Sequence, residues 1–235
     1  MVKLGNFLFR YRNGLFPVFY ALLFIPSPTL FENPFAAIGL GLAIALLGQS
    51  IRVATIGLEY IIRGGKDKKV YAEKLVTDGL FRHCRNPLYV GNILELLGLG
   101  VVANSLIFVA AIVPLFIFFY QAIVRAEENF LLQKFGEDFR VYMREVNRWL
   151  PNLSGLGNTL SSMRFNWRRV LLKEYNSTFI WMGAAVLASA KTLYWSSEYI
   201  PQPETKFYLI TIFIILAITY GVVRYLKKSK KLVMH

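Results

Sequence analysis

Six apolar stretches of roughly membrane-spanning length constrain the fold of this 235-residue chain more than any other feature. A helix needs about 20 mainly apolar residues to cross the hydrocarbon core of a bilayer. A segment buried in lipid must satisfy its own backbone hydrogen bonds, so each stretch is expected to be helical. The six stretches cover residues 15–30, 34–62, 88–103, 106–124, 178–195 and 207–225.

Composition agrees with a membrane protein and excludes several other classes. Hydrophobic residues make up 55% of the chain and charged residues 17%, against about 45–50% and 25% in typical soluble domains. Disordered chains instead have low hydrophobicity and high net charge. The single cysteine, Cys84, excludes a disulfide scaffold, and with only two histidines no structural zinc or other metal site is expected. The predicted fold class is an all-α, polytopic membrane helical bundle of about six transmembrane helices with cytoplasmic amphipathic helices.

The basic residues predict the topology. Most of the 27 Lys and Arg residues lie before the first stretch, in 63–85, in 125–173 and in 224–231. With six spans, all four segments fall on one side, and the positive-inside rule places both termini in the cytoplasm. We expect a multi-pass integral membrane protein of a prokaryotic inner membrane. The net charge of +13 then points to membrane lipids as partners and not to nucleic acid.

Two turn signals divide the chain. Asn104-Ser105 is the only break between the third and fourth stretches, which predicts an antiparallel helical hairpin. Residues 152–162, NLSGLGNTLSS, are typical of a turn-rich linker. The predicted units are a core at 1–151 with its motif region at 75–151, a linker and interfacial basic helix at 152–176, and a C-terminal transmembrane hairpin with a basic tail at 177–235.

The first candidate site segment covers residues 75–92 and leads into the third stretch. Pro87 suits the first turn of a helix, so Arg85 and Asn86 are expected at a helix N-terminus. Free backbone N–H groups beside a guanidinium favour anion binding. The alternative is an interfacial anchor, in which Arg85 contacts a headgroup phosphate and Tyr89 lies in the aromatic belt.

The second candidate segment covers residues 125–151. Its apolar residues up to Val146 recur at helical spacing and predict an amphipathic, bent helix. Glu127 and Glu128 fall where the fourth stretch leaves the membrane, and one of them is expected to point inwards. A carboxylate there can bind ribose hydroxyls or a positive ligand. The alternatives are a solvated helix start or an ion pair with Arg125.

Three ionisable residues lie within the stretches, where charge is costly and usually faces a partner or a cavity. Arg52 is expected to pair with Glu95 on a neighbouring span, and Glu59 lies near enough to a span end to reach the interface. A structural pair and a substrate-binding role both remain open.

Together the two segments resemble the isoprenylcysteine carboxyl methyltransferase and phospholipid methyltransferase superfamily of integral membrane enzymes. The family pattern is a Gly-x-Tyr-Arg-x-x-Arg-His-Pro-x-Tyr-x-Gly block, a helical hairpin, a Glu-Glu pair, Phe-Gly, spaced aromatics and Arg-x-x-Pro. Asn86 departs from it, standing where the family has His, and Phe81 and Phe139 replace frequent tyrosines. The matching residues are Gly79, Phe81, Arg82, Arg85, Pro87, Tyr89 and Gly91, then Glu127, Glu128, Leu131, Phe135, Gly136, Phe139, Tyr142, Arg148 and Pro151.

The resemblance implies transfer of a methyl group from S-adenosyl-L-methionine to a lipid-like or amphiphilic acceptor at the cytoplasmic membrane face. The acceptor is an isoprenylcysteine carboxylate, a phospholipid amine or a similar group, and the sequence leaves it and the oligomeric state open. A base, if the acceptor needs one, is Glu128, Glu95 or His83. The implied cofactor-binding residues are Leu75, Val76, Thr77, Phe81, His83, Arg85, Asn86, Pro87, Tyr89, Glu127 and Glu128.

Within that set, the resemblance suggests separate roles. Arg85 is expected to hold the cofactor carboxylate, and Glu127 or Glu128 the ribose or the amino group. An aromatic ring, of Tyr89 or Phe81, is expected against the sulfonium or adenine. The backbone of residues 75–77 is expected to line the adenine.

Two other functions remain open at this point. Membrane sterol reductases look similar in the same block but bind NADPH, and they are usually longer with more spans before it. A transporter or lipid-binding scaffold would instead use Arg52, Glu59 and Glu95 to line a pathway. Binding of S-adenosylhomocysteine, of NADPH or of neither separates the three functions.

Overall fold

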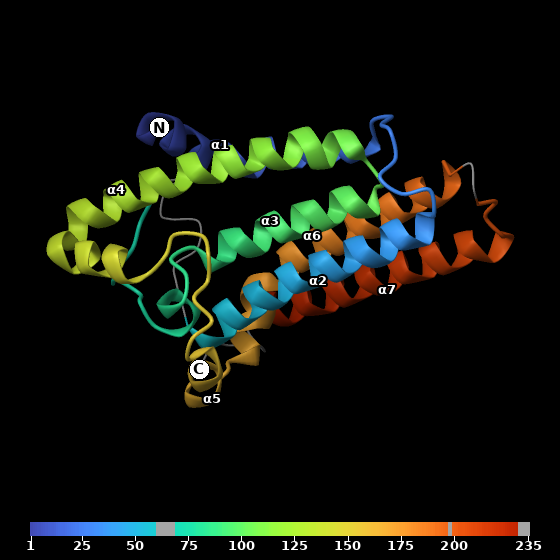
Figure 1. The fold of residues 1–235 in the computed structure, drawn as a ribbon. Coiled ribbons are helices and arrows are strands. Elements are labelled where there is room, and N and C mark those ends of the chain that lie inside the picture. The colour runs from blue at the N-terminus through green and yellow to red at the C-terminus, as the bar shows by residue number, and fades with distance from the viewer. Residues whose placement is uncertain (60–68, 197–198, 230–235) are drawn as a thin grey trace.

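The computed structural model describes residues 1–59, 69–196 and 199–229, and long α-helices dominate it (Figure 1). The predicted all-α fold class is confirmed. The α-helices are α1 (Val2–Ala21), α2 (Pro34–Leu58), α3 (Pro87–Val102), α4 (Val113–Glu145), α5 (Leu156–Ser162), α6 (Trp167–Tyr194) and α7 (Pro203–Lys228). Short 3-10 turns cover Leu22–Phe24 and Gly79–Arg82, and a π-helical turn, Phe108–Ile112, precedes α4.

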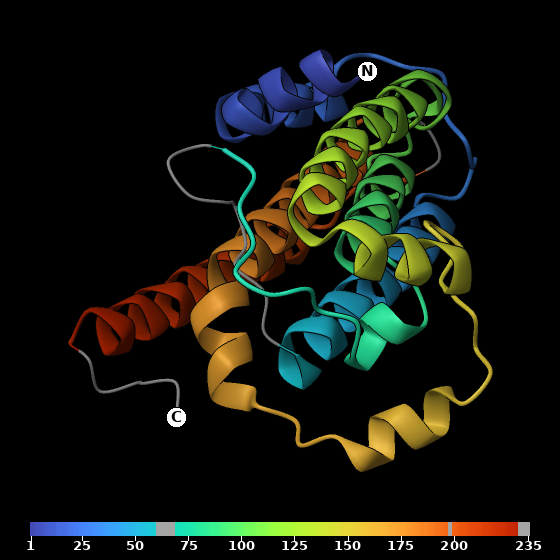
Figure 2. The ribbon, with the colours of Figure 1, turned by 90° about the vertical axis from the view of Figure 1, so that its left-hand side faces the viewer.

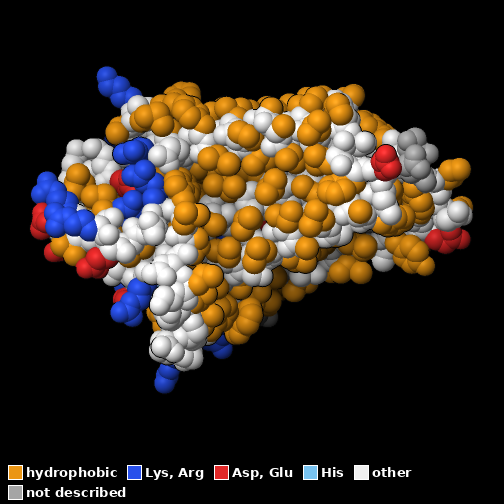
Figure 3. All heavy atoms as spheres, viewed as in Figure 1, with side chains coloured by type: hydrophobic (Ala, Val, Ile, Leu, Met, Phe, Trp, Pro, Cys, Tyr) orange, Lys and Arg blue, Asp and Glu red, His pale blue; other side chains and the backbone are white. Residues whose placement is uncertain are grey.

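The long helices form a bundle with an apolar middle. In the end-on view of Figure 2, α1 and α4 lie along one side of the bundle and α7 along another. Figure 3 shows hydrophobic side chains over the middle of the visible face, while Lys and Arg gather at the end that holds the kink of α4. Among the described residues, three segments are long and apolar enough to cross a membrane, namely Pro34–Leu58, Phe108–Glu145 and Pro203–Lys228, and α3 is apolar but shorter.

Several helix boundaries differ from those predicted. The first helix begins at Val2 and ends at Ala21, well before the predicted end at residue 30. The predicted interfacial helix and the predicted fifth span form one continuous helix, α6. Asn166 caps its start, because the Asn166 side chain accepts from the Arg169 N–H at 2.9 Å. The linker contains the short helix α5. The predicted end of the second span at 60–62 and the tail beyond 229 lie outside the described residues.

Helices α2 and α3 touch backbone to backbone through glycines. A Cβ atom added to Gly48 would lie 2.6 Å from the carbonyl oxygen of Gly91, and one added to Gly98 would lie 2.6 Å from that of Gly41. Small residues allow this approach between helices in a membrane. The contact fixes α3, and with it the residues at its N-terminal end, against α2.

The predicted hairpin between α3 and the π-helical turn is confirmed. Asn104 has a φ of 50° at the turn. Its side chain accepts from the N–H groups of Leu30 and Phe31 at 2.8 and 3.0 Å, and donates to the Phe31 carbonyl at 2.8 Å. These bonds tie the hairpin to the segment before α2. The predicted bend in the next helix is also present, because Gly136 in α4 has a φ of 53° and a non-helical ψ of −119°.

Candidate functional site

A large, partly open cavity lies between the helices of the described structure, and it brings most of the predicted site residues together. Its volume is about 1390 Å³, above the roughly 300–1,000 Å³ of most small-molecule pockets. Helices α1, α3, α4, α6 and α7 and the segment 70–76 contribute to its walls. The cavity therefore has room for more than one small ligand.

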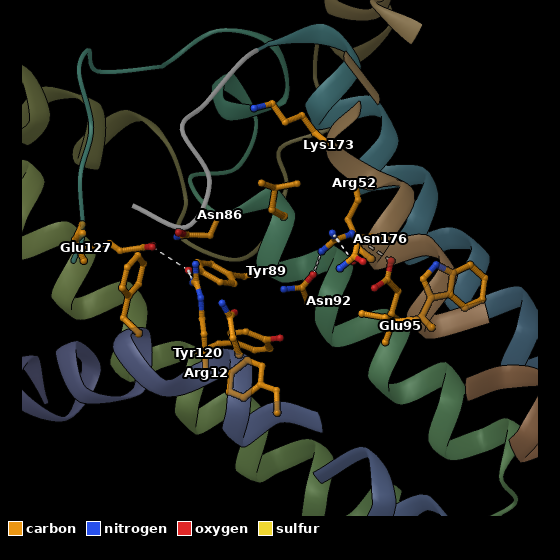
Figure 4. Close-up of a pocket in the computed structure, with 18 of the residues that line it drawn as sticks. Arg12, Arg52, Asn86, Tyr89, Asn92, Glu95, Tyr120, Glu127, Lys173 and Asn176 are labelled. Atoms are coloured by element: carbon orange, nitrogen blue, oxygen red, sulfur yellow. Dashed lines mark hydrogen bonds and ion pairs between the residues drawn. The ribbon is translucent and has the colours of Figure 1, made fainter. Parts of the chain in front are cut away.

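The first polar group in the cavity joins three helices (Figure 4). Tyr89 of α3 donates its hydroxyl proton to Glu127 Oε1 of α4 at 2.9 Å. Arg12 of α1 donates from Nη1 to the same hydroxyl oxygen at 3.2 Å. The Tyr89 ring lies against Tyr120, with ring centroids 5.0 Å apart. This Arg12–Tyr89–Glu127 chain presents a cation and a carboxylate to one part of the cavity.

Glu128 has different partners from its neighbour. Its carboxylate accepts from Arg148 Nε at 2.9 Å and from Arg148 Nη2 at 2.6 Å, and it lies 3.4 Å from Arg85 Nη2. Arg85 also donates to the Met143 carbonyl at 3.2 Å. Burial lowers the pKa of Arg85, while the Glu128 charge opposes that shift. The Glu128 carboxylate thus links the segment before α3 to the chain after α4. Among the described residues, Glu128 pairs with Arg85 and Arg148, and not with Arg125 as the alternative interpretation of the sequence had it.

A buried charge cluster forms the second polar group of the cavity. Arg52 Nε lies 3.3 Å from Glu95 Oε1, which confirms the predicted pair, and Arg52 Nη2 lies 2.7 Å from Glu174 Oε2 of α6. Arg52 also donates to Asn92 and, at 2.9 Å, to Ser177. The carboxylate of Glu95 is therefore held in an ion pair. Sequence reasoning missed Glu174 because it lies in a run of basic residues that looked interfacial.

The remaining predicted residues divide into two groups. Leu75, Val76, Phe81 and Asn86 line the cavity, as do Arg85, Tyr89, Glu95, Glu127 and Glu128. The cavity lining does not include Thr77, His83 or Pro87.

His83 makes contacts that explain its position outside the cavity. Its Nδ1 lies 2.6 Å from the Asn152 carbonyl oxygen, and its Nε2 lies 2.8 Å from the Thr159 hydroxyl of α5. Both ring nitrogens are thus bonded within the loop structure. The neighbouring thiol of Cys84 contacts the Arg148 and Trp149 carbonyls at 3.5 Å, and burial raises its pKa.

Apolar and aromatic side chains make up much of the remaining cavity wall, called here the apolar arm. Phe16 and Tyr20 of α1, Ile180 and Leu187 of α6, and Phe213 of α7 line it. Cavities that take amphiphiles need this combination of a few polar groups and a long apolar wall. The site can therefore hold a charged, polar ligand beside an apolar one.

Sequence reasoning missed Arg12, the cation nearest the Tyr89 hydroxyl. It belongs to neither motif block, and its helix was expected to begin only at residue 15. The one available signal was a basic residue close to an apolar stretch, which is ordinary at a membrane surface.

Comparison with known proteins identifies the family. Residues 36–138 match the phospholipid methyltransferase family. The cobalt-zinc-cadmium resistance protein CzcN of Cupriavidus metallidurans is 35% identical over 64% of this chain and 68% of its own length. The nickel-cobalt-cadmium resistance protein NccN of Alcaligenes xylosoxydans xylosoxydans is 30% identical over 64% of this chain and 70% of its own.

A third relative carries an enzyme name. A probable protein-S-isoprenylcysteine O-methyltransferase of Oryza sativa subsp. indica is 35% identical over 56% of this chain and 68% of its own length. No solved structure matches the chain significantly. The family match covers α2, α3 and most of α4, which carry Tyr89, Glu95, Glu127 and Glu128. The chain belongs to the phospholipid methyltransferase family of membrane proteins.

Proposed function

We propose that this protein transfers a methyl group from S-adenosyl-L-methionine to an amphiphilic acceptor at the cytoplasmic face of the membrane. The family supports a membrane methyltransferase in general. The observation that carries the finer proposal is the cavity itself, which places the Arg12–Tyr89–Glu127 chain next to an apolar arm.

The cavity residues fit the chemical groups of the cofactor. Glu127 offers a carboxylate for an ammonium or for ribose hydroxyls, and Asn86 also lines the cavity. Phe81 and Tyr89 offer aromatic rings, which attract a cation such as a sulfonium. When bound, S-adenosylmethionine supplies a methyl group on a positively charged sulfur.

Our proposal differs in two residue roles from those that the resemblance suggested. Glu128 contacts both Arg85 and Arg148, so we assign Arg85 and Glu128 to stabilising the wall of the cofactor pocket. Glu95 pairs with Arg52, so it is not assigned as a base. Attack in line on a methyl group depends mainly on positioning and exclusion of water, and the apolar part of the cavity wall favours both.

The apolar arm indicates the class of acceptor. Apolar side chains of α1, α6 and α7 line it, and a ligand with an apolar tail buries that tail favourably there. The basic residues gathered at the end with the α4 kink favour the cytoplasmic side for the cofactor. The acceptor then comes from the bilayer and the cofactor from the cytoplasm.

Methyl transfer in membranes tests this function. Membranes containing the protein are incubated with methyl-labelled S-adenosylmethionine, and label is counted in the organic extract. We expect label there with the wild type and a large loss with Glu127→Gln. Glu137→Gln is the matched control, because Glu137 lies on the exposed part of α4 and pairs with Arg140 at the surface. Equal labelling by membranes that lack the protein contradicts the proposal.

A further inference from the structure

The cations of the cavity differ in what they are already bound to. A ligand carboxylate needs a cation that is oriented but not neutralised by a carboxylate of the protein. Among the described residues, the cations that line the cavity are Arg12, Arg52, Lys74, Arg85, Lys173 and Lys227.

Three of these cations already face protein carboxylates. Arg52 contacts both Glu95 and Glu174. Arg85 contacts Glu128, and Lys74 lies 3.5 Å from Glu59. Binding a ligand anion at any of them means competing with a fixed negative charge.

Two further cations belong to a different part of the cavity. Lys227 of α7 donates to the Leu172 carbonyl at 3.1 Å and lies over the Tyr175 ring. Figure 4 shows Lys173 of α6 apart from Tyr89 and Glu127. Neither is placed beside the Tyr89–Glu127 pair.

Arg12 meets both requirements. Its guanidinium donates to the neutral Tyr89 phenol and lies 4.2 Å from the centroid of the Phe9 ring. Among the described residues, the carboxylate that acts on Arg12 is that of Glu127, which is linked to it through the Tyr89 hydroxyl and not by a direct ion pair. Its helix is held closely, because a Cβ atom on Gly5 would lie 2.0 Å from the Ala122 carbonyl oxygen of α4. The cation is therefore fixed in place with donors left for a ligand.

Arg12 and Glu127 flank one hydroxyl group, that of Tyr89, so opposite charges stand two hydrogen bonds apart. That arrangement is complementary to a zwitterionic α-amino acid, whose carboxylate and ammonium lie on one carbon. We infer that Arg12 binds the carboxylate of the amino-acid portion of the cofactor while Glu127 binds its ammonium. This inference rests on the proposed function. It assigns a ligand contact to α1, which lies outside residues 36–138 that match the family.

Calorimetric titration with two ligands that differ only by the carboxylate tests the inference. The ligands are S-adenosylhomocysteine and its decarboxylated analogue, titrated into the detergent-purified protein. We expect Arg12→Ala to raise the Kd for S-adenosylhomocysteine about tenfold to hundredfold, the usual range for a hydrogen bond to a charged group. The Kd for the decarboxylated analogue should stay that of the wild type.

Two further variants keep the test decisive. Arg10→Ala is the matched control, because Arg10 is an exposed cation on the same helix that lies over Tyr11. It should bind both ligands like the wild type. Arg12→Lys keeps the positive charge but loses the planar, forked guanidinium. Its affinity for S-adenosylhomocysteine should therefore fall less than that of Arg12→Ala, and its affinity for the decarboxylated analogue should not change.

The possible failures can be told apart. If Arg12→Ala and Arg12→Lys weaken the binding of both ligands equally, or of neither, Arg12 does not bind the carboxylate and the inference is wrong. If the wild type binds neither ligand, the proposed function is wrong, and so is this inference, which rests on it.

Discussion

Replacing Glu128 by glutamine tests whether this residue is structural. The substitution keeps the size of the side chain but removes a charge that contacts Arg148 at 2.6 and 2.9 Å and Arg85 at 3.4 Å. Breaking a fully buried pair by removing one partner costs about 3–5 kcal/mol. The Arg148 side chain is 21% exposed, so solvent compensates part of that cost, and we expect a loss of about 2–3 kcal/mol.

The single cysteine provides a built-in assay for that loss. Cys84 is 1% exposed and contacts the Arg148 carbonyl, so a thiol-reactive fluorophore labels it only when this region opens. For a chain of this size, about 2–3 kcal/mol corresponds to a fall in Tm of about 4–12 °C. The control Glu137→Gln removes a carboxylate that is 60% exposed, and it should leave Tm unchanged. A Glu128→Gln protein with the Tm of the wild type would refute the structural role.

Three further predictions concern packing, the hairpin and the thiol. Gly48→Ala pushes against the Gly91 carbonyl and should destabilise the protein by about 1–3 kcal/mol in the same assay, whereas Gly39→Ala, with open space around it, should not. Asn104→Ala removes three hydrogen bonds to the segment before α2 and should lower Tm, while replacement by Gly, which suits the positive φ but loses the bonds, should lower it too. Burial raises the pKa of Cys84, so folded protein should hold less thiolate than unfolded protein at the same alkaline pH; equal ultraviolet absorbance by the thiolate of the two across a pH series would contradict this.

The sequence predicted those parts of the structure that depend on local patterns. Apolar length predicted the helical bundle, and the short break at Asn104 predicted the hairpin. Intramembrane charge predicted the pair of Arg52 with Glu95, which the structure places 3.3 Å apart. In each case the physical constraint acts within a few residues or on a rare residue type, so it can be read without knowing the fold.

The parts that could not be predicted depend on long-range packing. Arg12 enters the cavity only because α1 packs against α4, and no motif marks it. Glu127 and Glu128 are adjacent in sequence, so only the fold separates the residue that faces Tyr89 from the one that holds Arg148. The continuity of α6 was missed because a basic, aromatic segment at its start is equally typical of an interfacial helix.

The measurement that tests the central claim most directly is a calorimetric titration of the wild-type protein with S-adenosylhomocysteine, with NADPH titrated in parallel. The account predicts saturable binding of S-adenosylhomocysteine at a single site and no binding of NADPH. Binding of NADPH alone would contradict it and indicate a reductase. Binding of neither would mean that the cavity holds no nucleotide-like cofactor, as expected of a transporter or scaffold.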